Sequence, residues 1–178
     1  MKRVFLVGYM GVGKTTIGKL LSKELDIQFI DLDKFIESRF RKTIQDIFAK
    51  KGEGEFRIIE REMLREVATF QNVLIATGGG TPCFYDNMEV MNHHGITVYI
   101  KATVDQLVSR LLASKNVRPI IENKSPKELT EFVITHLAER ERYYSKAKIT
   151  YETEVLITKT HVAKNVTAIE RLLHTFIN

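Results

Sequence analysis

The chain has 178 residues, of which 44% are hydrophobic and 28% charged, with a net charge of +5. A chain of this length forms one globular domain, residues 1–178, with a core that needs no disulfide or structural metal. A single cysteine, Cys83, excludes an internal disulfide and suits a reducing compartment, so we expect a cytoplasmic protein. No apolar stretch approaches the roughly 18 to 20 residues that span a bilayer, which argues against membrane insertion. The basic residues are scattered among acidic ones, which argues against nucleic-acid binding. We also expect the protein to be a monomer.

Strand and helix patterns alternate along the chain. Short apolar runs predict five strands, at residues 3–7, 28–30, 73–77, 96–100 and 155–157. Apolar residues at helical spacing predict helices at 17–25, within about 56–70, at 104–112, about 126–144 and 162–176. Strands separated by helices require crossover connections, so the sequence predicts an α/β fold with a parallel sheet covered by helices on both faces.

A phosphate-binding loop follows the first predicted strand. Residues 8–15, Gly-Tyr-Met-Gly-Val-Gly-Lys-Thr, match the P-loop pattern G-x-x-x-x-G-K-[ST] in full. Glycines let the backbone wrap so that its N–H groups point at phosphate oxygens, and the start of the next helix adds partial positive charge. We expect Lys14 to neutralise the β and γ oxygens of a nucleotide and Thr15 to present its hydroxyl to Mg²⁺. The residues expected to bind ATP here are Gly11, Val12, Gly13, Lys14, Thr15 and Thr16.

The rest of the chain separates the classes of P-loop protein. A GTPase reads guanine with an Asn-Lys-x-Asp segment, and the nearest stretch here, residues 123–126, has proline in place of the aspartate. In many P-loop proteins the strand at this place in the sequence ends in an aspartate that holds Mg²⁺. Here the third predicted strand is followed by three glycines, residues 78–80. The acidic residues instead follow the second strand, which favours a kinase for a small molecule over a GTP-dependent switch.

Asp31 and Asp33 lie just past the end of the second strand, beside the P-loop, where open α/β sheets bind ligands. One carboxylate can hold Mg²⁺ through its waters, because hard cations prefer oxygen ligands. The other can accept the hydrogen bond of an attacking hydroxyl and position it toward the γ-phosphate. The alternative for Asp33 is that it caps the start of a helix.

Three arginines are candidates for binding an anion. Arg140 falls on the apolar stripe of a long helix, three residues beyond Leu137, where it needs either an anion or a route to water. Arg57 lies in a charge-rich helix for which a solvated face is the ordinary explanation. Arg118 lies in a polar loop between two helices, where a lid would carry an arginine onto a transferring phosphoryl group, or where it is simply a surface residue.

These pieces together resemble the shikimate kinase family over nearly the whole chain. The matching segments are residues 8–16, 29–33 (Phe-Ile-Asp-Leu-Asp), 52–57 (Gly-Glu-Gly-Glu-Phe-Arg), 77–80 (Thr-Gly-Gly-Gly), 117–120 (Val-Arg-Pro-Ile) and Arg140 with Tyr144 behind it. Each segment is short, but their order and spacing make the combination specific.

The resemblance implies that ATP phosphorylates the 3-hydroxyl of shikimate. Asp33 would bind the ring hydroxyls and act as, or assist, the base. Arg57 and Arg140 would hold the shikimate carboxylate, because a guanidinium group suits a carboxylate geometrically. Gly79 would contact the substrate, and a helical region at about residues 32–62 would form much of its binding site.

The resemblance also implies roles on the nucleotide side. Lys14 would act in catalysis, and Mg²⁺ would be bound by Thr15 with support from Asp31. Arg118 would bind ATP and act in catalysis from a lid at about residues 113–125. Such a lid would close over bound substrate and limit transfer of the γ-phosphoryl group to water.

Alternatives remain at this stage. Another small-metabolite kinase of the same fold, such as a gluconate or nucleoside monophosphate kinase, would share the P-loop. A nucleotide-dependent switch would bind nucleotide without transferring phosphate to a small acceptor. Residues 158–163 lack the proline expected in the family's adenine-contacting loop, so no adenine contact is assigned, and the role of Arg110 is open.

Overall fold

A computed structural model describes residues 2–114, 121, 124–153 and 158–177 of the chain. The strands are β1 (Arg3–Val7), β2 (Gln28–Asp31), β3 (Val73–Ala76), β4 (Ile96–Lys101) and β5 (Ile149–Glu152). The helices are α1 (Lys14–Glu24), α2 (Leu32–Phe40), α3 (Ile44–Val67), α4 (Asn87–His94), α5 (Val104–Ala113), α6 (Pro126–Tyr144) and α7 (Lys159–Ile177), with a short 3-10 turn, η1 (Thr81–Cys83).

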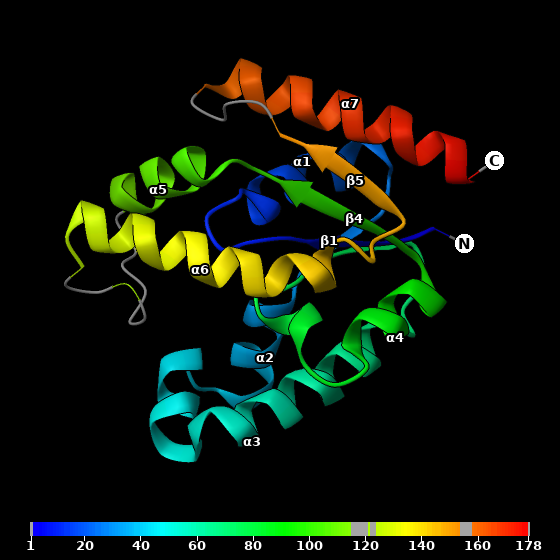
Figure 1. Cartoon of the computed structure of the whole chain (residues 1–178). Coiled ribbons are helices and arrows are strands. Elements are labelled where there is room, and N and C mark those ends of the chain that lie inside the picture. Colours follow the sequence, from blue (N-terminus) through cyan, green and yellow to red (C-terminus); the bar gives the residue numbers. More distant parts are fainter. Residues whose placement is uncertain (1, 115–120, 122–123, 154–157, 178) are drawn as a thin grey trace.

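A five-stranded parallel sheet forms the centre of the molecule, with the strand order β2-β3-β1-β4-β5. Figure 1 shows α1 and α7 on one side of the sheet and α3, α4 and α6 on the other. Residues 4–7 of the central strand β1 are fully buried, which explains their uninterrupted apolar sequence. The predicted α/β class and five-stranded parallel sheet are therefore confirmed.

The strand order determines where a ligand can bind. From β1 the chain moves to the sheet edge at β2, returns to β3 beside β1, and then continues on the other side of β1 with β4. In open α/β sheets the crevice at such a reversal, outside the carboxyl ends of the strands, is the usual ligand site. The P-loop follows β1, the two aspartates lie where β2 passes directly into α2, and the three glycines follow β3, so all three lie at this edge.

The fifth strand corrects one prediction. It is Ile149–Glu152, which pairs in parallel with β4, so the range 155–157 placed it too late along the chain, and that range lies outside the described residues. Only Ile149 of this edge strand is buried. A strand paired on one side alternates apolar and polar residues, and this weak pattern is less visible than a continuous apolar run.

The five predicted helices are present, and two helices, α2 and α4, lie outside the predicted ranges. The predicted helix at about 126–144 is α6, which begins at a capping box in which Ser125 and Glu128 exchange hydrogen bonds. The helical material after β2 consists of α2 and α3, and α3 is kinked at Gly52, whose φ is 76°. A φ in the left-handed region suits glycine, so this residue allows the chain to turn inside the helix.

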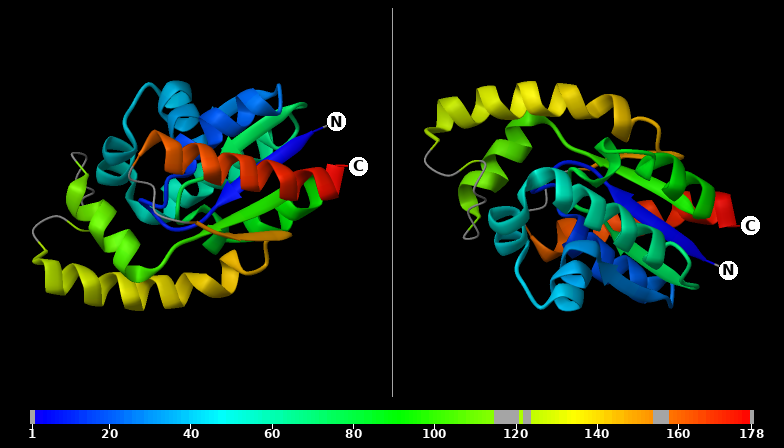
Figure 2. Two further views of the ribbon diagram at one scale, coloured as in Figure 1. Left: turned by 90° about the horizontal axis from the view of Figure 1, so that it is seen from above. Right: turned by 90° about the horizontal axis from the view of Figure 1, so that it is seen from below.

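The two ends of the described chain lie together, far from the ligand edge. Figure 2 shows both termini at one end of the molecule and α5, with the beginning of α6, at the opposite end. Within the described residues, no helix has both the length and the apolar character needed to cross a membrane.

Candidate active site

The P-loop connects β1 to α1 and has the backbone geometry of an anion site. Gly8, Gly11 and Gly13 have φ values of 141°, 78° and 99°, in the region that favours glycine. The N–H of Val12 donates to the carbonyl oxygen of Tyr9 at 3.3 Å and closes the loop. Because α1 begins at Lys14, the first N–H groups of that helix face the loop, where an anion is favoured.

Lys14 is held inside this loop. Its ammonium donates to the carbonyl oxygens of Gly8 at 2.7 Å and Tyr9 at 2.9 Å, and the residue is only 8% exposed. These oxygens satisfy a charged group that would otherwise be costly to bury. The positive charge is therefore concentrated at the loop, as expected for a phosphate-binding lysine.

Asp31 joins the P-loop to the next element. Its Oδ2 accepts a hydrogen bond from the Thr15 hydroxyl at 2.7 Å, and its Oδ1 accepts one from the Lys34 N–H at 3.3 Å. Asp31 is therefore the N-cap of α2, so the capping role considered as an alternative for Asp33 is filled by Asp31. A hydroxyl and a carboxylate this close form a hard oxygen pair, which suits Mg²⁺.

Asp33 points toward a different part of the site. It lies in the first turn of α2, and a Cβ added to Gly78 would be 3.0 Å from its Oδ1. The Asp33 carboxylate is thus beside the glycine turn after β3, while Asp31 bonds to Thr15 of the P-loop. The structure separates two carboxylates whose roles the sequence left open.

Arg57 is buried, which overturns the expectation of a solvated helix face. It is 8% exposed, and its Nη1 donates to Glu60 Oε2 at 2.9 Å. Its Nε and Nη2 donate to Glu53 Oε1 at 3.3 Å and 3.1 Å, and the guanidinium carbon lies 4.0 Å from the ring centroid of Phe84. A Cβ on Gly80 would lie 2.8 Å from both Nη atoms, so this position accepts no side chain without moving Arg57.

Glu60 connects Arg57 to the turn that follows the glycines. It is 1% exposed, accepts from Arg57, and accepts from the Thr81 hydroxyl at 2.6 Å. The carbonyl oxygen of Thr81 in turn accepts from the Asn87 side chain at 2.9 Å. This buried network fixes the Arg57 guanidinium relative to the glycine turn.

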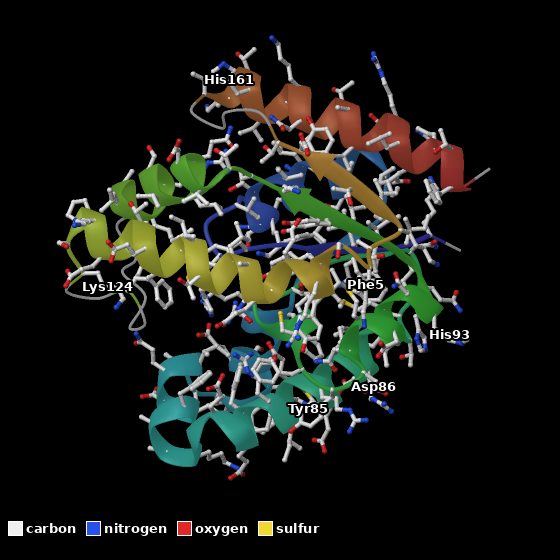
Figure 3. All side chains as sticks on the ribbon, in the orientation of Figure 1. Phe5, Tyr85, Asp86, His93, Lys124 and His161 are labelled. Atoms are coloured by element: carbon white, nitrogen blue, oxygen red, sulfur yellow. The ribbon has the colours of Figure 1, made fainter. Side chains whose placement is uncertain are left out.

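A surface cluster holds the same two segments together from outside. Asp86 accepts hydrogen bonds from Arg61 at 3.0 Å and Arg65 at 2.7 Å, both on α3, and Figure 3 shows Tyr85 and Asp86 beside that helix. The hydrogen bond from Arg61 lowers the pKa of the Asp86 carboxyl. These exposed pairs are individually weak, but they fix α3 against the start of α4.

Gly79 lies where the P-loop and α6 meet. A Cβ at this position would be 3.1 Å from the Met10 N atom, 3.5 Å from Arg140 Nη1 and 3.6 Å from the Gly8 carbonyl oxygen. Arg140 is half-buried and forms no ion pair with any residue that the structure describes. The guanidinium therefore faces the site, rather than extending to solvent at the end of its helix.

Tyr144 supports Gly79 from the end of α6. Its hydroxyl donates to the Gly79 carbonyl oxygen at 2.6 Å, and the residue is fully buried. Burial is the main reason that the pKa of the Tyr144 phenol is raised, and the charge of Arg140 acts in the opposite direction. Its ring packs on Tyr99, whose hydroxyl donates to Glu141 at 2.6 Å, so α6 is anchored to β4 at this point.

Cys83 lies close to the two arginines but is not a reactive thiol. Burial raises its pKa to about 11, although the charges of Arg140 and Arg57 act to lower it. A thiol with such a pKa is protonated near neutral pH and is a poor nucleophile. No group of three or more His, Cys, Asp or Glu residues within the described part of the chain could bind a metal ion together.

The sequence also drew attention to Arg110 and Arg118. Arg110 on α5 donates from Nη1 to the carbonyl oxygen of Val12 in the P-loop at 3.0 Å, and burial lowers its pKa. The sequence left its role open, and this contact places it against the phosphate-binding loop. Arg118 and most of the expected lid lie outside the described residues.

The chain matches one protein family over most of its length. A family model described as shikimate kinase matches residues 10–170 of the chain. The chain belongs to the shikimate kinase family. The shikimate kinase of Parabacteroides distasonis is 51% identical over 173 residues, a match that covers 97% of this chain and 100% of the relative.

Solved structures of shikimate kinases agree with the fold. The crystal structure of the Bacteroides thetaiotaomicron enzyme superposes with a TM-score of 0.94 at 46% identity and covers 97% of this chain and 98% of its own. The Acinetobacter baumannii enzyme, in complex with shikimate, gives 0.84 at 30% identity and covers 100% and 96%. A gluconokinase from Sinorhizobium meliloti shares only the fold, with 11% identity and a TM-score of 0.60.

Membership of the shikimate kinase family decides between the alternatives left by the sequence. The chain is an ATP-dependent kinase rather than a nucleotide-binding switch. Its relatives show that it is a shikimate kinase rather than a gluconate kinase. The resemblance drawn from short segments of sequence is confirmed.

Two features of the site were not anticipated from the sequence. One is the burial of Arg57 among acidic and aromatic partners. The other is a hydrogen bond at 2.9 Å between Tyr9 of the P-loop and His136 of α6. The only signal for the second was spacing, because His136 precedes Arg140 by four residues and so lies on the same face of α6.

Proposed function

We propose that the chain transfers the γ-phosphoryl group of ATP to the 3-hydroxyl of shikimate, giving shikimate 3-phosphate and ADP in the shikimate pathway. The observation that carries the proposal is the convergence of four separate segments beside the P-loop. Asp33 contributes a carboxylate, Arg57 and Arg140 contribute cations, and Gly79, which has no side chain, lets the P-loop and Arg140 approach its backbone closely. An acceptor with both hydroxyl groups and a carboxylate matches this set.

On the acceptor side, we assign the carboxylate of shikimate to the two arginines. Arg140 is the more available, because its guanidinium has no carboxylate partner among the described residues, whereas Arg57 already bonds to Glu53 and Glu60. Asp33 accepts the hydrogen bond of the attacking hydroxyl, holds it in line with the γ-phosphate and assists removal of its proton. Gly79 contacts the bound substrate.

On the donor side, the P-loop binds the phosphates of ATP through residues 11–16. Lys14 moves its ammonium from loop carbonyls to phosphate oxygens, which costs little because both are oxygen acceptors. Thr15 and Asp31 provide the hydroxyl and carboxylate that fit Mg²⁺. When bound, Mg²⁺ supplies positive charge to the phosphate oxygens.

Arg118 is proposed to complete the site from a lid at about residues 113–125. Transfer to water competes with transfer to the acceptor, and an arginine that arrives only on closure limits that competition. An Arg118→Ala variant with unchanged turnover and unchanged ATP affinity would remove this assignment.

The experiment that tests the function is a coupled ADP-release assay with shikimate, gluconate and nucleoside monophosphates as acceptors. We expect turnover with shikimate, with the product identified as the 3-phosphate by ³¹P and ¹H NMR. Turnover with another acceptor and none with shikimate would overturn the proposal. Asp33→Asn and Arg140→Ala test the site separately, because normal rates in both would reject the assigned residues even with the activity established.

We also propose that the enzyme acts as a cytoplasmic monomer without a nucleic-acid partner. The basis is its scattered charge and single cysteine. Light scattering coupled to size-exclusion chromatography gives the mass directly, and a dimer mass at assay concentration would contradict the first part.

A further inference from the structure

The P-loop and α6 are joined by a side-chain hydrogen bond that none of the assigned roles uses. Tyr9 Oη and His136 Nδ1 are 2.9 Å apart, and their rings meet edge to face with centroids at 5.6 Å. The two residues are 127 positions apart in sequence, so the contact is purely tertiary. Tyr9 is 1% exposed, which leaves its ring little freedom to move.

Tyr9 is tied to the donor side through its backbone. Its carbonyl oxygen accepts from the Lys14 ammonium at 2.9 Å and from the Val12 N–H at 3.3 Å. The orientation of the Tyr9 peptide therefore affects both the shape of the loop and the place of the lysine. Fixing the Tyr9 side chain fixes this peptide from the other side.

His136 is tied to the acceptor side through its helix. It lies one helical turn before Arg140, and its ring packs on Phe132 with centroids 4.8 Å apart. Burial is the main cause of the lowered pKa of His136, and the charge of Arg140 lowers it further, because the two side chains lie close together on α6. Lys124, labelled in Figure 3 at the start of α6, lies 5.2 Å from the Phe132 ring centroid.

Four residues at four-residue intervals thus form one stripe along α6: Phe132, His136, Arg140 and Tyr144. In order, they contact the segment before α6, the P-loop, the acceptor site and the Gly79 carbonyl. The stripe connects the part of the site that holds phosphate to the part that holds the acceptor.

We infer that Tyr9 and His136 are positioning residues that fix the P-loop relative to Arg140, and so set the distance between the γ-phosphate and the acceptor hydroxyl. The inference rests on the proposed function, in which Lys14 holds the phosphate and Arg140 the acceptor carboxylate. Neither Tyr9 nor His136 needs to touch a substrate. Their contribution is alignment, to which the transfer rate is more sensitive than the binding of either substrate alone.

The test measures kcat and both KM values for Tyr9→Phe, His136→Ala and the double variant. We expect each single variant to lower kcat about five- to ten-fold, the size expected for a lost buried hydrogen bond, while both KM values change less than about two-fold. The double variant should lose no more than the more affected single variant, because both remove the same bond. His136→Asn should recover much of the rate, since its amide oxygen can accept near the position of Nδ1.

The control is Thr135→Ala on the same helix, whose hydroxyl donates to the Glu131 carbonyl oxygen within α6. Wild-type kcat in Tyr9→Phe, additive losses in the double variant, or equal losses in His136→Asn and His136→Ala would each overturn the inference. Failure of the proposed function would look different, because the wild-type enzyme would then favour another acceptor, and the same cycle would be measured with that acceptor.

Discussion

The donor and acceptor sides of this site are built in opposite ways. The donor side is one continuous segment, residues 8–15, in which glycines allow the turns and the carbonyl oxygens of Gly8 and Tyr9 accept the hydrogen bonds of the lysine. The acceptor side takes single residues from α2, α3, α6 and the turn after β3. The geometry of a single loop is determined by its own residues. A site assembled from several elements depends on how those elements pack.

The difference extends to the two arginines of the acceptor side. Arg57 is buried with Glu60, and together they form part of the packing between α3 and the glycine turn. Arg140 has no such carboxylate partner among the described residues and is held by the position of its helix. We therefore expect Arg57 to serve both stability and substrate binding, and Arg140 to serve substrate binding alone.

The largest expected effect is on the donor side. Lys14→Met should lower kcat by about 100- to 1,000-fold, the range for losing a group that stabilises developing charge in the transition state. ADP release in the presence of shikimate measures it. Lys19→Met, an exposed position on the same helix, is the control and should leave the rate unchanged. A Lys14→Met rate within ten-fold of wild type would contradict the assigned role.

Substitution of the two arginines should affect different properties, namely substrate binding alone for Arg140 and both binding and stability for Arg57. Arg140→Ala should raise the KM for shikimate by about 30- to 100-fold through loss of charge-assisted hydrogen bonds, with little change in stability. Arg57→Ala should also lower the free energy of unfolding by about 3 kcal/mol, because it leaves the Glu60 carboxylate buried without its cation. Urea unfolding and steady-state kinetics of both variants separate the effects.

A second substitution sharpens that comparison. Adding Glu60→Gln to Arg57→Ala should recover part of the lost stability, because an amide is less costly to bury than an unpaired carboxylate. Recovery should not extend to the KM for shikimate. Equal stability losses in Arg57→Ala and Arg140→Ala would show that the contrast between the arginines is wrong.

A smaller effect is expected at Glu53. This exposed carboxylate accepts from two nitrogens of Arg57, so a substrate carboxylate that binds the same edge must displace it. Glu53→Gln should therefore lower the KM for shikimate by about two-fold and leave the KM for ATP unchanged. Glu55→Gln, whose carboxylate pairs with Lys51 on the same helix, is the matched control. A higher KM in Glu53→Gln would mean that Glu53 orients Arg57 instead.

The smallest effect concerns pH. Burial, followed by the charge of Arg140, lowers the pKa of His136 from 6.5, against the opposing charges of Glu139 and Glu53. The folded protein then holds fewer protons than the unfolded one, so this contribution to stability is present above pH 6.5 and is lost as the pH falls through the lowered pKa. The fall in urea midpoint from about pH 7.5 to about pH 5.5 should be smaller in His136→Asn than in wild type. Identical falls would contradict the lowered pKa.

The sequence predicts the donor side well because its information is local. The P-loop, the strand before it and the helix after it occupy one stretch of chain, and the structure reproduces them. The weak pattern of β5 shows the limit, since an edge strand is selected by its partner β4 more than by its own residues. Asp31 and Asp33 show another limit, because both suit a cap, and Asp31 serves because α2 begins at Leu32 and the Lys34 N–H bonds to Asp31.

The acceptor side was predictable only through resemblance to a family. Arg57 lies among charged neighbours, and its burial depends on Glu60, Phe84 and the absence of a side chain at Gly80. Those contacts join positions far apart in the chain, so helical periodicity carries no trace of them. The bond between Tyr9 and His136 escaped for the same reason.

The stripe on α6 limits where residues can be inserted into this chain or deleted from it. Each residue of a helix adds about 100° of rotation and about 1.5 Å of rise. An insertion of one residue between Phe132 and Tyr144 would turn every later member of the stripe away from its contact, although each side chain would still be present. The number of residues between Phe132 and Tyr144 is therefore fixed by these contacts. We expect this stretch of helix to tolerate substitutions far more readily than insertions or deletions, whereas loops can change in length.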